Sequence, residues 1–212
     1  MTRAIRKPKA SLRLIYIHGA NSTYRSFAYM REKIGGQDLM LDYVSQSGFF
    51  NNLEVMVNIL QSLPKHEKFF VIGHSLGGLY AMHLLKPLRD RILGGFTMST
   101  PYGGSELAHV ARFIAPTTRL LRDAHPGSRP VMEAKPIPIG MPWTNIVTTM
   151  GGVSWIMGPN DGVVSIASMT ARPDMELIQK PLNHFEVVLE DEVIELCKAQ
   201  IERASLALHA QP

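Results

Sequence analysis

The chain has 212 residues, 45% of them hydrophobic, which is enough for one sizeable core but short for two domains. The formal net charge is +4, yet apart from a basic tail at residues 1–11 the lysines and arginines are scattered, and no cluster interleaved with aromatics predicts nucleic-acid binding. No apolar run approaches membrane-spanning length and no signal-peptide pattern precedes Leu12, so we expect a cytoplasmic protein without an integral membrane segment. Cys197 is the single cysteine, which permits no internal disulfide.

Strand and helix patterns alternate through the first part of the chain. Apolar runs bounded by turn residues predict strands, and apolar residues at helical spacing predict helices. In chain order the expected elements are a strand at Leu12–Ile17, a helix at about Tyr24–Ile34, a strand at Leu39–Val44, a helix at Asn51–Leu63 and a strand that begins near Phe69.

The alternation continues after residue 75. The expected elements are a helix at Leu76–Lys86 that Pro87 ends, a strand at Gly95–Ser99, further strands around Thr144–Thr149 and Met175–Ile178, and a closing helix at Glu190–Leu208. Strands that alternate with helices of this length predict βαβ units. We therefore expect one α/β domain over residues 12–208, with a mainly parallel central sheet and helices on both faces.

Residues 105–142 interrupt this alternation. Leu107–Ile114 carries one apolar helical face, and the prolines that follow exclude long regular elements. We interpret the segment as a short cap insertion. The alternative is an irregular connection packed on the core, because an amphipathic helix buries its apolar face against whatever is nearest.

The pentapeptide Gly73-His74-Ser75-Leu76-Gly77 joins a strand-like run to a helical one. A serine at such a strand-to-helix turn adopts a strained backbone, and glycines two residues away on each side avoid a clash. The pattern also arises by chance in glycine-rich turns, so the prediction depends on the strand-like run before it and the helical run after it. Together they make Ser75 a candidate nucleophile.

A serine nucleophile needs a base within hydrogen-bonding reach, which the fold expected here supplies downstream and after the acid. His184 is the best candidate, since it lies in a short loop between the expected last strand and the closing helix. His109 and His125 lie in the cap-like segment, and His209 lies near the end of the chain.

Asp161 is the preferred acid. It lies in a turn-rich loop before the strand that leads to His184, and a carboxylate beside the imidazole would fix the tautomer of the base. Asn160-Asp161-Gly162 is also ordinary turn chemistry. Glu106 and Asp174 are the alternatives.

Two backbone N–H groups are needed for the oxyanion. Leu76, directly after the nucleophile, supplies one, and the loop that follows the first strand supplies the other, through Ala20 or alternatively Asn21. We interpret His18 as a structural residue that holds this loop.

Five segments in this order resemble the α/β-hydrolase superfamily, and within it small bacterial lipases and esterases and the serine esterases similar to GPI inositol-deacylases. They are His18-Gly19, Gly73–Gly78, Ser99–Ser105, Asp161–Val164 and Asn183-His184. The resemblance covers residues 12–200 and implies Ser75, Asp161 and His184 as the nucleophile, acid and base of an esterase. Tyr102 departs from it, because many relatives carry histidine there.

The sequence therefore predicts a serine esterase or lipase that acts on a small-molecule or lipid ester through an acyl-enzyme. No metal or organic cofactor motif occurs. A thioesterase, amidase or acyltransferase on the same scaffold is the alternative, as is a non-catalytic binding protein of the same fold, because fold does not fix function. The oligomeric state is left open.

Overall fold

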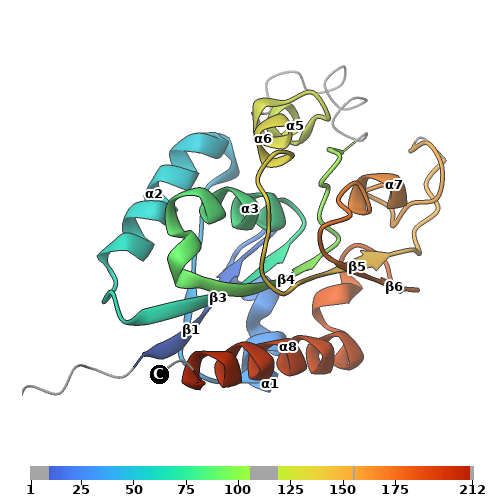
Figure 1. Cartoon of the computed structure of the whole chain (residues 1–212). Helices are drawn as coiled ribbons and strands as arrows, with labels where there is room; N and C mark the ends of the chain where they lie inside the picture. The colour runs from blue at the N-terminus through green and yellow to red at the C-terminus, as the bar shows by residue number, and fades with distance from the viewer. Residues whose placement is uncertain (1–9, 106–118, 155, 211–212) are drawn as a thin grey trace, which may run out of the picture.

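A six-stranded sheet forms the centre of the protein. The computed structural model describes residues 10–105, 119–154 and 156–210. The strands are β1 (Ser11–Ile17), β2 (Asp38–Met40), β3 (Glu67–His74), β4 (Ile92–Met98), β5 (Trp143–Thr148) and β6 (Glu176–Lys180). Their order is β2-β1-β3-β4-β5-β6, and every neighbouring pair is parallel (Figure 1). The predicted parallel α/β sheet is confirmed.

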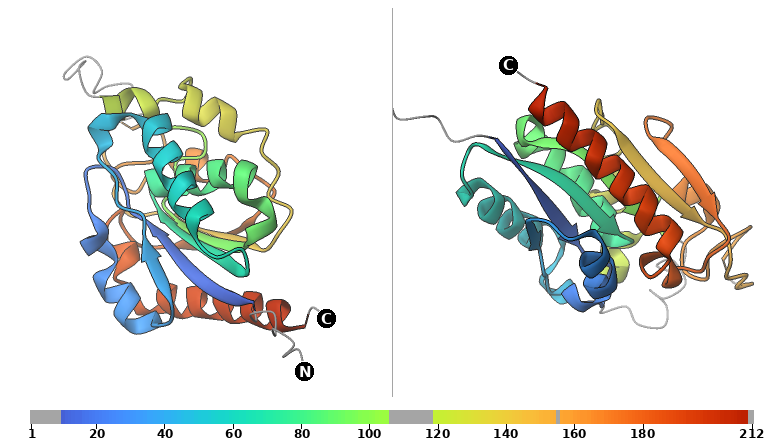
Figure 2. Two further views of the ribbon diagram at one scale, coloured as in Figure 1. Left: turned by 90° about the vertical axis from the view of Figure 1, so that its left-hand side faces the viewer. Right: turned by 90° about the horizontal axis from the view of Figure 1, so that it is seen from below.

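Helices cover both faces of this sheet. α2 (Phe49–Ser62) and α3 (Leu76–Leu88) pack on one face, and α1 (Ala28–Ile34) and α8 (Asp191–His209) pack on the other (Figures 1 and 2). Side chains alternate between the two cores, as in β1, where Ile15 and Ile17 face α2 and α3 while Leu14 and Tyr16 face α1 and α8. The expected helices on both faces are thus present.

The remaining elements are short and lie in the connections. They are η1 (Tyr24–Phe27), η2 (Ser45–Ser47), η3 (Arg89–Arg91), α5 (Arg119–Ala124), α6 (Arg129–Ala134), α7 (Ile166–Met169) and η4 (Glu186–Val188).

Several predicted boundaries differ from the observed ones by a few residues, as for β4, which begins at Ile92 rather than Gly95. Two of the differences have a local cause. The strand expected at Leu39–Val44 ends at Met40. Beyond it the N–H of Tyr43 donates to the ring of His18 instead of to a backbone carbonyl, so the ladder with β1 stops. The helix after Ser75 does not end at Pro87 but continues to Leu88. A proline in the last turn removes only one N–H donor there, so the helix tolerates it.

The segment at 105–142 is described only in part. The expected cap helix at Leu107–Ile114 lies outside the described residues, and whether it forms a cap stays a prediction. Beyond it, Val131 and Ile139 belong to the core that contains α3. The buried Arg172 guanidinium donates to the carbonyl oxygens of Ala134 and Ile137. Residues 129–139 are therefore a connection packed on the core.

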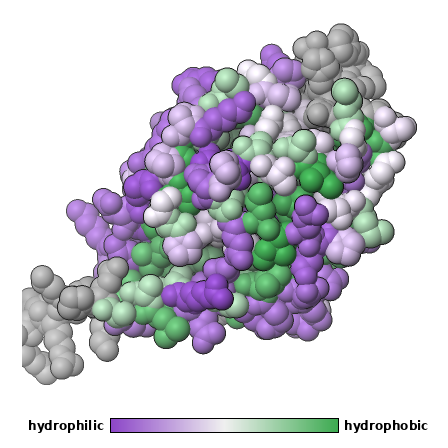
Figure 3. All heavy atoms as spheres, turned by 45° about the vertical axis from the view of Figure 1, so that its right-hand side comes forward, coloured by the Kyte–Doolittle hydropathy of each residue, from purple (hydrophilic) through white to green (hydrophobic). Residues whose placement is uncertain are grey.

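Apolar side chains also reach the surface. Figure 3 shows apolar surface interrupted by hydrophilic side chains on the face that turns the β6 side of the molecule forward. Leu177 of the edge strand β6 and Leu206 of α8 are among the exposed apolar residues. In the described part of the chain, no helix is both long and apolar enough to cross a membrane.

Helix α3 begins in direct contact with the end of β1. A Cβ atom on Gly77 would lie 2.0 Å from the carbonyl oxygen of Ile17 and 2.7 Å from that of His18. A Cβ on Gly73 would lie 2.9 Å from the backbone nitrogen of Gly78. The glycines of the pentapeptide are therefore required by backbone contacts, as the sequence predicts.

Replacing Gly77 with alanine forces β1 and α3 apart, and the clash is with backbone that cannot turn aside. We expect Gly77→Ala to lower the free energy of unfolding by about 3 kcal/mol, measured by urea denaturation. Gly127→Ala is the control, since its Cβ would meet no atom closer than 3.5 Å. Equal stability of the two variants would contradict the required contact.

Candidate active site

Ser75 lies at the turn between β3 and α3. Its φ of 52° and ψ of −123° are unusual for a residue other than glycine. Its backbone N–H donates to the carbonyl of Met98 on β4, and its carbonyl accepts from the N–H of Gly78, so neighbouring elements hold the strained turn. The side chain sits above the ends of the central strands, with the residue only 8% exposed.

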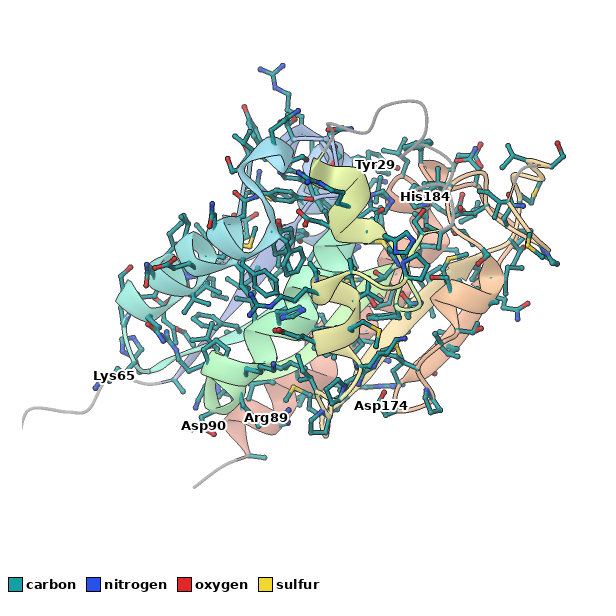
Figure 4. The ribbon with its side chains drawn as sticks, turned by 90° about the horizontal axis from the view of Figure 1, so that it is seen from above. Tyr29, Lys65, Arg89, Asp90, Asp174 and His184 are labelled. Atoms are coloured by element: carbon teal, nitrogen blue, oxygen red, sulfur yellow. The ribbon has the colours of Figure 1, made fainter. Side chains whose placement is uncertain are left out.

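His184 lies in the loop after β6, labelled in Figure 4, and its ring contacts Ser75. The distance between Nε2 and Ser75 Oγ is 3.0 Å, and Nδ1 is 2.8 Å from Asp161 Oδ2. A carboxylate only accepts, so Nδ1 carries the proton and Nε2 is left to accept from the serine hydroxyl. The structure thus brings the three predicted residues into one hydrogen-bonded chain.

The carboxylate of Asp161 is buried and fully hydrogen-bonded. Oδ1 accepts from the N–H groups of Val163 and Val164 at 3.0 and 2.8 Å. Oδ2 accepts from His184 and from the hydroxyl of Thr148 at 2.5 Å. Burial by itself raises the pKa of Asp161, but the hydrogen bonds from His184, Thr148 and Val164 outweigh it and hold the pKa below its usual value. The acid is therefore ionised.

A second buried histidine supports the first. His74 Nε2 lies 2.8 Å from the carbonyl oxygen of His184, so it carries a proton and fixes the backbone of the His184 loop. Its Nδ1 is buried without a recorded partner among the described residues. Burial, followed by the nearby His184, lowers the pKa of His74 to about 3. His74 is therefore a neutral donor rather than a second base.

The candidate oxyanion donors lie on both sides of Ser75. Among the described residues, no recorded acceptor engages the N–H groups of Ala20 or Leu76. The N–H of Asn21, the alternative candidate, instead donates to Ser45 Oγ at 3.0 Å and is therefore already occupied. A Cβ on Gly19 would be 3.2 Å from Cβ of Ser75, so this loop passes directly beside the serine.

His18 holds that loop in place. Its Nδ1 lies 2.7 Å from the carbonyl oxygen of Gly19, and its ring stacks on Tyr43 at a centroid distance of 4.2 Å. In a trans peptide the N–H points opposite to the carbonyl, so fixing the Gly19 carbonyl also fixes the direction of the Ala20 N–H. The structure agrees with the interpretation of His18 as a structural residue.

The alternative acids and bases take other positions. Asp174 lies before β6, at the opposite end of that strand from His184 (Figure 4), and pairs with Arg172 at 2.7 Å. Glu106 and His109 lie outside the described residues. His125 follows α5, where its Nδ1 accepts from the N–H of Gly127, and His209 is the last residue of α8.

Sequence reasoning missed two hydroxyls behind the acid. Thr148, at the end of β5, gives its only proton to Asp161, so Ser99 Oγ donates to Thr148 Oγ1 at 2.8 Å. Both residues are fully buried, and Ser99 has a φ of 51°. The position of Thr148 at the end of a predicted strand could have marked its hydroxyl as a candidate. The sequence does not show which residue that hydroxyl contacts.

A cavity of about 360 Å³ opens over this arrangement. Its walls come from the loop after β1, from Ser75 and its neighbour His74, and from residues 184–189. A cavity of this size fits a small ligand. No cluster of three His, Cys, Asp or Glu side chains that could bind a metal ion occurs in the described ranges.

Because His74 is buried in its neutral form, we expect the free energy of unfolding to depend on pH. Its pKa is near 6.5 in the unfolded chain and about 3 in the folded one. Between these two pH values the unfolded state binds a proton at His74 and the folded state does not. Stability is lost as the pH falls. We expect His74→Gln to reduce the stability loss between pH 7 and pH 5 by about 2 kcal/mol, measured by urea unfolding.

His209→Gln, at the exposed end of α8, is the control and should leave the pH dependence unchanged. The same pH slope in wild type and His74→Gln would show that His74 is protonated in the folded protein.

Comparisons with known proteins identify the scaffold. No protein-family model matches the chain, and no curated protein matches it in sequence. Among solved structures, a mature lipase of Bacillus licheniformis is similar over 92% of this chain and 96% of its own, with a TM-score of 0.70 and 16% identity. A metagenomic carboxyl esterase is similar over 86% and 69%, with a TM-score of 0.66 and 16% identity.

A third solved structure carries the name of the fold. The mouse α/β hydrolase domain-containing protein 10 is similar over 92% of this chain and 90% of its own, with a TM-score of 0.59 and 15% identity. At these identities the likeness concerns the scaffold, and it agrees with the parallel sheet and the serine turn described above. The chain has the α/β-hydrolase fold.

Proposed function

We propose that this protein is a serine hydrolase that cleaves carboxylic esters, with Ser75 as nucleophile, His184 as general base and Asp161 as the acid that orients it. The observation that carries the proposal is the hydrogen-bonded chain Ser75–His184–Asp161 beside a cavity. Its distances of 3.0 and 2.8 Å are those that proton transfer requires.

In the first half of the reaction, Ser75 Oγ attacks the ester carbonyl carbon and its proton passes to His184 Nε2. The N–H groups of Ala20 and Leu76 stabilise the oxyanion. The tetrahedral intermediate collapses, the C–O bond to the alcohol breaks, and His184 returns the proton to the leaving alcohol. The acyl group stays on Oγ of Ser75.

Water completes the cycle. It attacks the acyl-enzyme while His184 takes one of its protons, and collapse of the second intermediate returns that proton to Ser75 Oγ as the carboxylic acid leaves. Throughout, the ionised Asp161 stabilises the imidazolium that forms on His184. No cofactor enters any step.

The structural neighbours support the ester as the bond cleaved. Two of them are a lipase and a carboxyl esterase. A thioesterase, amidase or acyltransferase would use the same three residues, so substrate panels rather than geometry separate these activities.

We expect Ser75→Ala and His184→Ala to abolish nearly all turnover of 4-nitrophenyl butyrate, and Asp161→Asn to lower kcat by several orders of magnitude by disturbing the tautomer of the base. Asp174→Asn is the control for the acid, because Asp174 lies at the other end of β6. Full activity of Asp161→Asn would contradict the assignment of the acid.

A fluorophosphonate probe separates an enzyme from a non-catalytic binding protein. We expect a covalent adduct on Ser75 in wild type and none in Ser75→Ala, detected by mass spectrometry of the intact protein. Matched oxygen esters, thioesters and anilides then rank the activities. A thioester turned over far faster than its oxygen ester would replace the esterase assignment, and a folded wild type without an adduct would exclude a serine hydrolase.

Thr148 acts in this proposal as a positioning residue for the acid. Thr148→Val removes its donor to Asp161, and we expect kcat to fall about tenfold with little change in KM, whereas Thr148→Ser keeps the hydroxyl and most of the activity. The downfield proton resonance of the hydrogen bond between His184 and Asp161 should shift in the valine variant only. Equal activity of Val and Ser variants would assign Thr148 a packing role.

A further inference from the structure

We propose that the ester cleaved by this site carries an anionic group, bound by Arg25. This inference rests on the proposed function and narrows its substrate class. It starts from the composition of the cavity beside Ser75, whose two walls differ in chemistry.

One wall is polar. It is formed by the loop after β1 and by η1, and its side chains are those of Asn21, Ser22, Arg25 and Ser26. A second part of the lining is apolar and consists of Phe185, Val188 and Leu189, which follow the base His184. A ligand that fills the cavity therefore contacts both hydrocarbon and polar groups.

Arg25 is the permanently charged side chain of this lining. Three other arginines are neutralised by carboxylates: Glu67 pairs with Arg13, Asp38 with Arg31 and Asp174 with Arg172. Arg25 has no acidic partner among the described residues, and its guanidinium instead lies 5.9 Å from the centre of the Tyr24 ring. The cavity that contains Ser75 is thus also lined by an exposed guanidinium that no described carboxylate neutralises.

The backbone around Arg25 is held by hydrogen bonds. Thr23 caps η1, accepting from the N–H of Arg25 on its side chain, and its carbonyl accepts from the hydroxyl of Ser26. The planar guanidinium offers two parallel donors to a carboxylate or a phosphate, which a lysine does not. An anionic group on the substrate would find a charged partner there, while the apolar part of the substrate contacts Phe185 and Leu189.

Matched pairs of soluble esters test the inference. For the acyl side the pair is mono-4-nitrophenyl glutarate and 4-nitrophenyl valerate, and for the alcohol side it is 3-carboxyphenyl butyrate and phenyl butyrate. The readout is the ratio of kcat/KM for the anionic ester to that for the neutral one, which removes any general effect of a substitution on the site.

We expect this ratio to fall about tenfold in Arg25→Gln for one of the pairs, and further in Arg25→Glu, because an exposed charge-assisted contact is lost and then reversed. Raising the ionic strength should lower the wild-type ratio and leave that of Arg25→Gln nearly constant. Arg203→Gln on α8, away from the cavity, is the matched control and should keep the wild-type ratio. Unchanged ratios in both pairs would overturn the inference.

Binding without turnover separates this inference from the proposed function. In the Ser75→Ala background we expect the anionic ester of the responsive pair to bind more tightly than the neutral one, and Arg25→Gln to remove that difference, measured by calorimetry. Arg25-dependent binding in a protein whose wild type cleaves no ester would contradict the proposed function alone. Turnover with no Arg25-dependent preference would contradict this inference alone. A preference that appears only with anionic vesicles would also overturn it and assign Arg25 to membrane contact.

Discussion

The contact between the start of α3 and the end of β1 is the constraint on which the site depends. Because Gly77 has no side chain, the helix meets the carbonyls of Ile17 and His18 directly. This contact brings the loop after β1 beside Ser75, so that the backbone of Ala20 and the nucleophile face the same space. In the proposed function, a wider separation would take the Ala20 N–H away from the oxyanion even with the hydrogen bond between Ser75 and His184 intact. The packing of the core and the proposed chemistry therefore depend on the same contact.

Three buried histidines near this contact make different hydrogen bonds. His184 alone lies between a hydroxyl and a carboxylate, which makes its ring the one placed to exchange a proton with Ser75. His74 stays neutral and donates to the backbone of His184, and His18 holds the peptide that precedes Ala20. The identical side chain thus holds the His184 loop in one place and the Gly19 peptide in another, and in the proposed function it acts as the base in the third. The difference lies in the partner that each ring nitrogen meets.

Much of this arrangement could be predicted from the sequence because it is local. The alternation of strands and helices, the glycines around Ser75 and the position of His184 after a strand are all patterns within short segments. The partner of Thr148 could not be predicted, because it depends on how β5 is placed against the loop that carries Asp161. The early end of β2 likewise follows from the hydrogen bond of the Tyr43 N–H to the His18 ring, a contact between two segments that no periodicity encodes.

The two walls of the cavity have a consequence for how such a protein can change. Residues 21–26 and 185–189 are short connections that follow strands β1 and β6, and neither supplies the acid or the nucleophile. We therefore expect substitutions in them to alter which ester the proposed site accepts, while the sheet and the chain from Ser75 to Asp161 stay as they are. The two connections can change independently of each other, so the charge and the apolar character of the accepted ester can evolve separately and without a change in the proposed reaction.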